Sequence, residues 1–272
     1  MLELAQLPYL SYINNIMELY FKAIGIIIAL VTALWVLSVI IKDVSIVDIF
    51  WGLGFVIINA FYFIQSETHS TRQIIFLILV SLWGLRLTIY LAKRNIGKPE
   101  DYRYQQFRKD FGAERYWWVS YFQVFLLQAV LMAMISFPLL GVNISTDNSL
   151  NILDYIAIII WVIGFAFEAG GDYQLSNFKS KAENKGTVLN TGFWKYTRHP
   201  NYFGDSAVWW SFGLFTIAAG EYWYAFGALI MTFLIIRVSG VMLLEKSLKE
   251  SKKEYQDYVR KTSSFIPWPP NK

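Results

Sequence analysis

The stretch Lys195–Gly220, KYTRHPNYFGDSAVWWSFGLFTIAAG, passes directly from a polar segment into a run of residues suited to lipid. Pro200 disfavours helix at the residue before it and suits the first turn of a helix. The stretch therefore predicts a turn at Arg198–Asn201 that leads into a membrane helix. The N-terminus of such a helix presents N–H groups without intrahelical partners and a positive partial charge, which suits polar or anionic ligands.

Apolar runs of this kind recur along the whole chain. Of its 272 residues, 56% are hydrophobic and 16% are charged, whereas soluble proteins carry about 25% charged residues. A transmembrane helix needs about 17–25 apolar residues. The sequence thus predicts an all-α integral membrane protein, a single membrane domain over residues 1–272, with about seven transmembrane helices at Tyr20–Ile41, Ile46–Gln65, Gln73–Ala92, Trp118–Leu140, Ile152–Gly171, Tyr202–Ala219 and Tyr222–Leu244.

Several classes of protein are excluded by composition. The first nineteen residues contain no Lys or Arg, so the positive region of a cleavable signal peptide is missing. The chain has no cysteine, which excludes disulfides, thiol nucleophiles and cysteine-ligated metals. Two histidines cannot build the histidine-rich di-iron centre of membrane desaturases. No metal site is expected.

The basic residues predict the orientation in the membrane. They gather between the third and fourth runs, between the fifth and sixth runs, and in the last run and the tail, whereas the alternate connections hold Arg72 and little else. Cytoplasmic segments carry the excess of Lys and Arg. We therefore expect the N-terminus outside and the C-terminus in the cytoplasm. The net charge of +4 then reflects topology and anionic lipids, not nucleic acid.

Ionisable residues inside the expected spans gather at one depth. Arg86 lies seven residues before Lys93, about 10 Å below the cytoplasmic end. The other residues at this depth are Asp48, Glu168, Asp172, Asp205, Arg237 and Glu245. Charged groups within a membrane usually face a cavity or each other. The pattern predicts a polar cavity open to the cytoplasm; the alternative is a set of isolated ion pairs, such as Arg86 with Asp48.

Two stripes of polar residues suggest a large anionic ligand in this cavity. Arg86, Tyr90 and Arg94 share one helix face, and Asp172 and Lys179 follow each other at the end of the fifth run. Arg and Lys bind phosphate, so a phosphate-bearing cofactor fits. Neither GxGxxG nor GxxxxGK[ST] occurs. A dinucleotide would then be held in the membrane domain and not on a Rossmann sheet.

Three motifs carry a resemblance to a known family: FEAGGDYQLSNFK, GFWKYTRHPNYFGD and EYQDYVRKTSSFIPW. They resemble the C-terminal half of the steroid 5-alpha-reductase-like membrane enzymes, in particular their uncharacterised bacterial branch, over Asp154–Pro267. LRLTIYLAKRNIGKP is similar to the third helix of the reductases. That superfamily includes sterol C=C reductases and, more distantly, isoprenylcysteine carboxyl methyltransferases.

The resemblance implies seven helices and a cytosol-facing cavity that holds NADPH for reduction of a C=C bond conjugated to a carbonyl. Residues 151–268 would form the cofactor-binding half. Asp172 and Asn201 resemble cofactor contacts, while Asp205 and Lys179 stand where the reductases usually have Glu and Arg. The full expected cofactor-binding set is Asp172, Lys179, Arg198, His199, Asn201, Tyr202, Asp205, Arg237 and Glu245.

The helices in residues 20–140 would carry the catalytic, substrate-side residues Asp48, Arg86 and Tyr90. Arg86 and Tyr90 match an Arg and a Tyr that border cofactor and substrate in the reductases. Asp48 falls near the acidic residue that polarises the substrate carbonyl. The chain departs from the steroid reductases at Trp83, where they have a Tyr, and Trp offers an N–H donor but no titratable hydroxyl.

The leading functional hypothesis is therefore a membrane-embedded NADPH-dependent oxidoreductase. Its substrate would be a lipophilic molecule of sterol-like, isoprenoid or fatty-acyl type, taken from the lipids of a bacterial inner membrane at a site facing the cytoplasm. The alternative is an S-adenosylmethionine-dependent methyltransferase acting on a lipid or prenylated group, which Glu245, Tyr255 and Tyr258 would fit. A transporter or lipid-binding protein is the third class, disfavoured by the odd helix number and the lack of a visible inverted repeat.

Overall fold

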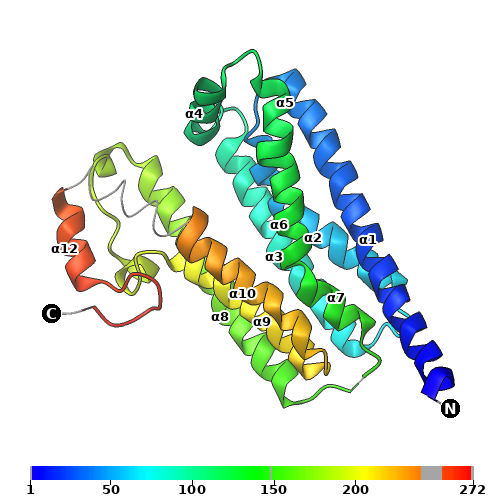
Figure 1. The fold of residues 1–272 in the computed structure, drawn as a ribbon. Helices are drawn as coiled ribbons and strands as arrows, with labels where there is room; N and C mark the ends of the chain where they lie inside the picture. The colour runs from blue at the N-terminus through cyan, green and yellow to red at the C-terminus, as the bar shows by residue number, and fades with distance from the viewer. Residues whose placement is uncertain (1, 148, 240–252, 271–272) are drawn as a thin grey trace. The chain divides into compact units, whose positions relative to one another are not determined.

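The structure is a computed structural model that describes residues 2–147, 149–239 and 253–270. Every regular element in these ranges is a helix (Figure 1). The all-helical prediction is thus confirmed. The chain divides into two compact units, Met1–Ser149 (unit 1) and Leu150–Lys272 (unit 2), each of which has its own helices and its own contacts.

Within the described residues, five helical segments are long and apolar enough to cross a membrane: Leu10–Ile41, Ile46–Gln65, Thr71–Asn95, Tyr116–Ile135 and Ile152–Ser180. Their exposed faces carry large apolar side chains such as Ile78, Phe122 and Ile159, which are suited to contact lipid and not water. The chain is therefore a multi-pass membrane protein. The two further predicted spans fall on a helix outside this set, Pro200–Ala218, and on a shorter apolar stretch, Tyr222–Arg237.

Unit 1 is built on three long helices, α1 (Leu2–Ile41), α2 (Ile46–Gln65) and α3 (Thr71–Asn95). The α2–α3 pair is in close backbone contact through Gly52 and Gly84. A Cβ added to Gly52 would lie 2.4 Å from the carbonyl oxygen of Gly84. Small residues at such crossings let membrane helices approach closely. The predicted runs Tyr20–Ile41 and Gln73–Ala92 cover only part of α1 and α3, which both extend beyond these limits.

The fourth predicted helix, Trp118–Leu140, is interrupted in the structure. It consists of α5 (Tyr116–Ser120), the π-helical segment η1 (Tyr121–Leu126), α6 (Leu127–Ile135) and α7 (Phe137–Ile144). Pro138 stands in the first turn of α7, where its missing N–H costs no hydrogen bond, so the break falls at Ser136. The short polar helix α4 (Tyr102–Phe111) precedes this series, with Asp101 as its N-cap.

Unit 2 pairs α8 (Ile152–Ser180) with α9 (Pro200–Ala218), and α9 packs against α10 (Phe226–Phe233) (Figure 1). The α8 helix continues nine residues past the predicted end at Gly171, so Asp172 and Lys179 lie on the helix itself. The remaining elements are the π-helical segment η5 (Leu234–Ser239), the tail helix α12 (Lys253–Lys261) and the 3₁₀ turns η2 (Ala182–Asn184), η3 (Gly192–Lys195) and η4 (Tyr222–Ala225).

Candidate functional site

The buried acidic residues of unit 2 lie on the face of α8 that meets α9. Gly164, Glu168 and Gly171 follow one another at helical spacing, and all three are buried. A Cβ on Gly204 of α9 would lie 2.3 Å from the backbone nitrogen of Glu168 and 2.4 Å from the oxygen of Gly164. The two helices are therefore in backbone contact, and Glu168, which lies at this contact, is only 3% exposed.

Asp172 and Asn201, predicted from separate motifs, lie side by side. Asn201 Nδ2 donates a hydrogen bond of 3.0 Å to Asp172 Oδ1, and Asp172 is only 4% exposed. Trp194 Nε1 also donates to the carbonyl of Gly171, at 3.1 Å. A buried carboxylate, an amide and the N-terminal turn of a helix are thus gathered at one point, where they offer both acceptors and donors to a polar ligand.

The Arg-His-Pro turn begins α9 as predicted, with Pro200 as the first residue of the helix. His199 precedes it as the N-cap residue and donates its backbone N–H to Thr197 Oγ1 at 3.2 Å. The His199 ring stacks on that of Tyr202, with centroids 5.8 Å apart. Asp205 follows one turn later and is half-buried. His199 is thus the N-cap of α9, and Asn201, Tyr202 and Asp205 lie in its first two turns.

Arg198 binds backbone oxygens of the C-terminal tail. Its Nη1 donates to the backbone oxygens of Val259 and Thr262, at 3.1 and 2.5 Å, and its backbone N–H donates to Ser263 O at 2.9 Å. Tyr258 donates its hydroxyl to Trp194 O from the tail side. Burial raises the pKa of Tyr258, so the hydroxyl keeps its proton. Arg198 thus fastens the tail to the segment before α9, a role that sequence reasoning did not assign to it.

We expect Arg198→Met to release this tail. Hydrogen bonds to a charged donor contribute about 1.5–3 kcal/mol each, so the population of molecules with an open tail should rise at least about tenfold. Limited trypsin digestion of the full chain, followed by mass spectrometry, would show faster cleavage after Arg260. Lys195→Met, which removes an exposed cation from the same segment, is the matched control. Equal cleavage rates in both variants would contradict the contact.

Three other predicted cofactor residues are not among the buried residues around Asp172. Lys179 is exposed on the last turn of α8, two turns beyond Asp172. Arg237 is exposed in η5. Glu245, also predicted from the sequence, lies outside the described residues.

In unit 1, Asp48 is held by α4. Tyr104 donates its hydroxyl to Asp48 Oδ1 at 2.7 Å, and Arg103 Nη2 donates to Asp48 Oδ2 at 2.7 Å. Burial and the adjacent Asp48 charge raise the pKa of Tyr104. Burial lowers the pKa of Arg103, but its bonds to Asp101 and the charge of Asp48 outweigh this and raise it above its usual value. Asp48 is therefore an acceptor of two donors, both of which come from α4.

Sequence reasoning missed Arg103 and Tyr104, although a signal was present. Asp101 is an N-cap residue that accepts a hydrogen bond from the backbone of Arg103 at 3.0 Å, and residues of this type mark a helix start. The short helix DYRYQQFRKDF could thus have been recognised as a structured element, not a loop. A second ion pair reinforces it: Arg108 binds Glu100 at 2.8 Å, and Glu100 accepts the backbone N–H of Val44, just before α2.

Arg86 and Tyr90 lie together on α3, as their spacing predicts. The Arg86 guanidinium stands 5.2 Å from the centre of the Tyr90 ring, and that of Arg94 stands 5.9 Å from it. Both contacts are within the range of cation–π attraction. Trp83, one turn earlier, is fully buried with its ring 6.0 Å from Phe55. The two arginines therefore flank one aromatic ring and form a basic stripe.

These observations define a multi-pass helical membrane protein with buried polar clusters near helix ends. A family model described as "Protein of unknown function (DUF1295)" matches residues 34–262, and the chain belongs to this family. A protein of Schizosaccharomyces pombe (strain 972 / ATCC 24843), described as "Uncharacterized protein C594.04c", is 25% identical, and the alignment covers 96% of this chain and 88% of that protein. No solved structure matches the chain significantly.

Proposed function

We propose that the protein is a membrane-embedded oxidoreductase that uses NADPH to reduce an activated C=C bond of a lipophilic substrate. The observation that carries the proposal is the hydrogen bond from Asn201, in the first turn of α9, to the buried carboxylate of Asp172. These two residues come from the two motifs that most resemble the steroid 5-alpha-reductase-like enzymes. The substrate class we propose is sterol-like, isoprenoid or fatty-acyl.

The proposal includes seven membrane crossings, with the N-terminus outside and the C-terminus in the cytoplasm of a bacterial inner membrane. The sixth crossing would be α9, whose 19 residues span about 28 Å at 1.5 Å per residue. That length is close to the hydrocarbon thickness of about 30 Å. The seventh would start at Tyr222. This arrangement is supported by the basic residues, since it places all three basic-rich segments on one side.

The donor set of unit 2 fits the polar parts of a nicotinamide dinucleotide. Asp172 and Asn201 provide an acceptor and a donor suited to ribose hydroxyls or a carboxamide. Lys179 and Lys195, which are both exposed, would bind the phosphates. Arg198 is left out of this set, because its guanidinium is occupied by the tail. When bound, the cofactor supplies a hydride; the protein supplies position and electrostatic field.

On the substrate side, residues of unit 1 would orient a carbonyl-bearing lipid. Arg86 and Tyr90 offer a cation and a hydroxyl on one face of α3, where they would stabilise charge on an oxygen. Asp48 would act through Tyr104: it accepts the tyrosine hydroxyl and so fixes that hydroxyl's direction. Trp83, buried against Phe55, would shape the apolar wall.

The proposal is tested by ligand-dependent stability of the purified full chain. A ligand at one hundred times its Kd stabilises the folded state by about 2.7 kcal/mol, so NADPH should raise the melting temperature. Asn201→Ala should weaken NADPH binding about tenfold, because it removes a hydrogen-bonding amide next to the buried Asp172 carboxylate. Asn177→Ala is the matched control, since Asn177 is an exposed residue of α8 in the same unit.

The outcomes separate the candidate activities. A shift with NADPH that Asn201→Ala reduces and Asn177→Ala leaves unchanged supports the oxidoreductase. A shift with S-adenosylmethionine and none with NADPH would overturn it in favour of the methyltransferase. Should neither ligand change the melting temperature, the cofactor assignment is wrong.

A further inference from the structure

The exposed face of α8 changes from apolar to polar near an exposed tyrosine. This face is apolar at Ile159 and polar at Asn177, and Tyr173, which is 71% exposed, lies between them. Near the start of the helix, Tyr155 is exposed as well. Tyr173 follows it by 18 positions, which span about 27 Å at 1.5 Å per residue, close to the hydrocarbon thickness of about 30 Å. Because tyrosines are enriched at both boundaries of a bilayer, Tyr173 marks the level of the lipid head groups.

The C-terminal tail of unit 2 is tied to α8 at this level. The segment before α9 bonds to α8 there: Phe193 donates its backbone N–H at 3.0 Å to Oε1 of Gln174, the residue after Tyr173. One short turn later, Tyr196 offers its backbone oxygen to the backbone N–H of Trp268 in the tail, at 2.9 Å. Figure 1 shows the tail and α12 at the end of unit 2 where α8 finishes. The tail therefore lies at the head-group level of the membrane.

The tail segment after α12 presents large apolar side chains outward from a fixed backbone. Exposed residues alternate with half-buried ones along it, as in an extended chain. Phe265 points inward, where its ring centre lies 6.1 Å from that of Phe203 of α9. Ile266 and Trp268 point outward and are 66% and 69% exposed. Because Arg198 also fastens this segment, the two side chains are held in place on an open surface.

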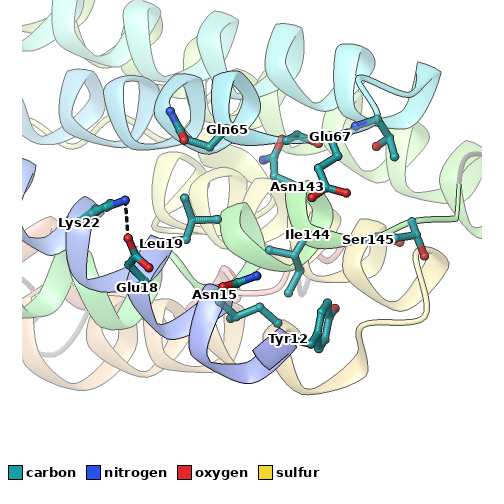
Figure 2. A pocket seen from close by; sticks show the side chains of 14 residues that line it. Tyr12, Asn15, Glu18, Leu19, Lys22, Gln65, Glu67, Asn143, Ile144 and Ser145 are labelled. Atoms are coloured by element: carbon teal, nitrogen blue, oxygen red, sulfur yellow. Dashed lines mark hydrogen bonds and ion pairs between the residues drawn. The ribbon is translucent and has the colours of Figure 1, made fainter. Parts of the chain in front are cut away.

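Two exposed lysines flank these side chains. Lys195 directly precedes Tyr196, and Lys261 ends α12 just before the tail. Neither lysine forms an ion pair with any residue in the described part of the chain. In this they differ from Lys22 of unit 1, which lines a pocket of about 380 Å³ and is paired with Glu18 at 2.6 Å (Figure 2). The charges of Lys195 and Lys261 are therefore available to an anion outside the chain.

We propose that the tail is an interfacial anchor, in which Ile266 and Trp268 insert among the lipid head groups and the two lysines bind the phosphates of anionic lipids. A tryptophan ring combines an apolar body with an N–H donor, which suits this depth of a bilayer. Each lysine near an anionic surface favours the bound state about fivefold. Since Arg198 fastens the tail to the turn before α9, the anchor would also hold that turn at the membrane surface. The inference rests on the membrane class of the protein and is independent of the proposed cofactor.

Site-directed spin labelling of the full chain in lipid nanodiscs tests the anchor. Because the protein has no cysteine, Ser264→Cys carries the only label; this exposed residue shares the outward face of Ile266 and Trp268 and leaves both in place. The depth of the label follows from its relaxation by oxygen, which concentrates in lipid, relative to relaxation by a water-soluble nickel chelate. Ile159→Cys on the apolar face of α8 and Ala182→Cys beyond its end give two reference depths. In nanodiscs of phosphatidylcholine and phosphatidylglycerol, the label at position 264 should lie between them.

The role of the lysines is tested with the same label. Lys195→Gln combined with Lys261→Gln should lower the ratio of inserted to free tail, read from the two spectral components, by about tenfold or more. Nanodiscs of phosphatidylcholine alone should have a similar effect. The matched control is Lys98→Gln combined with Lys109→Gln, which removes two exposed cations from unit 1 and should change nothing.

Three results would overturn the anchor. The first is a label at position 264 that is as accessible to the nickel chelate as the label at position 182. The second is a label shielded from both reagents, which would mean that protein and not lipid covers the tail. The third is an equal depth with and without anionic lipid. Because the substituted side chains are exposed, all variants should fold normally, which their melting temperatures check.

Discussion

Gly204→Ala is expected to destabilise the protein by about 3 kcal/mol, the upper part of the range for overpacking. The added Cβ would lie 2.3 Å from the nitrogen and 2.8 Å from the Cα of Glu168, and 2.4 Å from the oxygen of Gly164. All three are backbone atoms, so no side chain can move aside to make room. The α8 and α9 helices would have to separate, and the Glu168 and Asp172 carboxylates would lose their fixed surroundings.

The contact distances predict an order of effects among three Gly→Ala variants. Gly164→Ala places its Cβ 2.8 Å from Gly204 O and 2.9 Å from Val208 N, a milder clash at the same crossing. Gly25→Ala on α1 meets nothing within 4 Å and should be neutral or stabilising. Thermal unfolding in a single detergent should therefore rank the variants Gly204→Ala, Gly164→Ala and Gly25→Ala from least to most stable. Any other order would show that α8 and α9 are not in backbone contact.

Gln73→Leu is expected to cost about 3–5 kcal/mol, among the largest effects of a single substitution. The leucine fills similar space but removes four short hydrogen bonds, to Ser66, Thr68, Ser70 and Asn143. Several of the groups left behind are buried, so they cannot turn to water, and each adds a desolvation cost. The α2–α3 turn should lose its fixed shape.

The matched control for Gln73 is Gln65→Leu. Gln65 is exposed at the end of α2, eight residues before Gln73 and on the other side of the α2–α3 turn. The same substitution there should change the unfolding free energy by no more than about 0.5 kcal/mol. Chemical unfolding in detergent, followed by tryptophan fluorescence, gives both values. Comparable losses for the two variants would mean that Gln73 holds the turn by its bulk and not by its hydrogen bonds.

The membrane class and the all-helical fold could be predicted from the sequence, because lipid imposes one strong requirement: a long apolar run without charge. The ends of the helices could not be predicted this way. The α8 helix continues from Gly171 to Ser180 through polar residues, where hydropathy gives no signal but the backbone hydrogen bonds persist. Likewise, the apolar run Trp118–Leu140 does not reveal that Ser136 and Pro138 interrupt it. Hydropathy reports the solvent around a helix, not the continuity of its backbone.

Parts of the candidate site could also be predicted from the sequence. Pro200 fixes the start of α9 by local sterics alone, and this places Asn201 one residue into the helix. The contact between Asn201 and Asp172 is made by the tertiary fold, so local sequence does not predict it. The resemblance of the two motifs nevertheless marked both residues as cofactor contacts. The role of Arg198 could not be foreseen, because its acceptors are backbone oxygens at positions 259 and 262, which have no side-chain signature.

The hold of α4 on Asp48 has a consequence for any ligand that reaches this carboxylate. Arg103 and Tyr104 each donate to one of its oxygens, so a ligand that takes the place of either donor would have to displace α4 from the start of α2. Its observed affinity would equal its intrinsic affinity multiplied by the fraction of molecules in which α4 is displaced. A substitution that weakens the hydrogen bonds from Arg103 and Tyr104 would therefore tighten ligand binding without adding a contact to the ligand. The position of α4 would show whether a ligand is bound to Asp48.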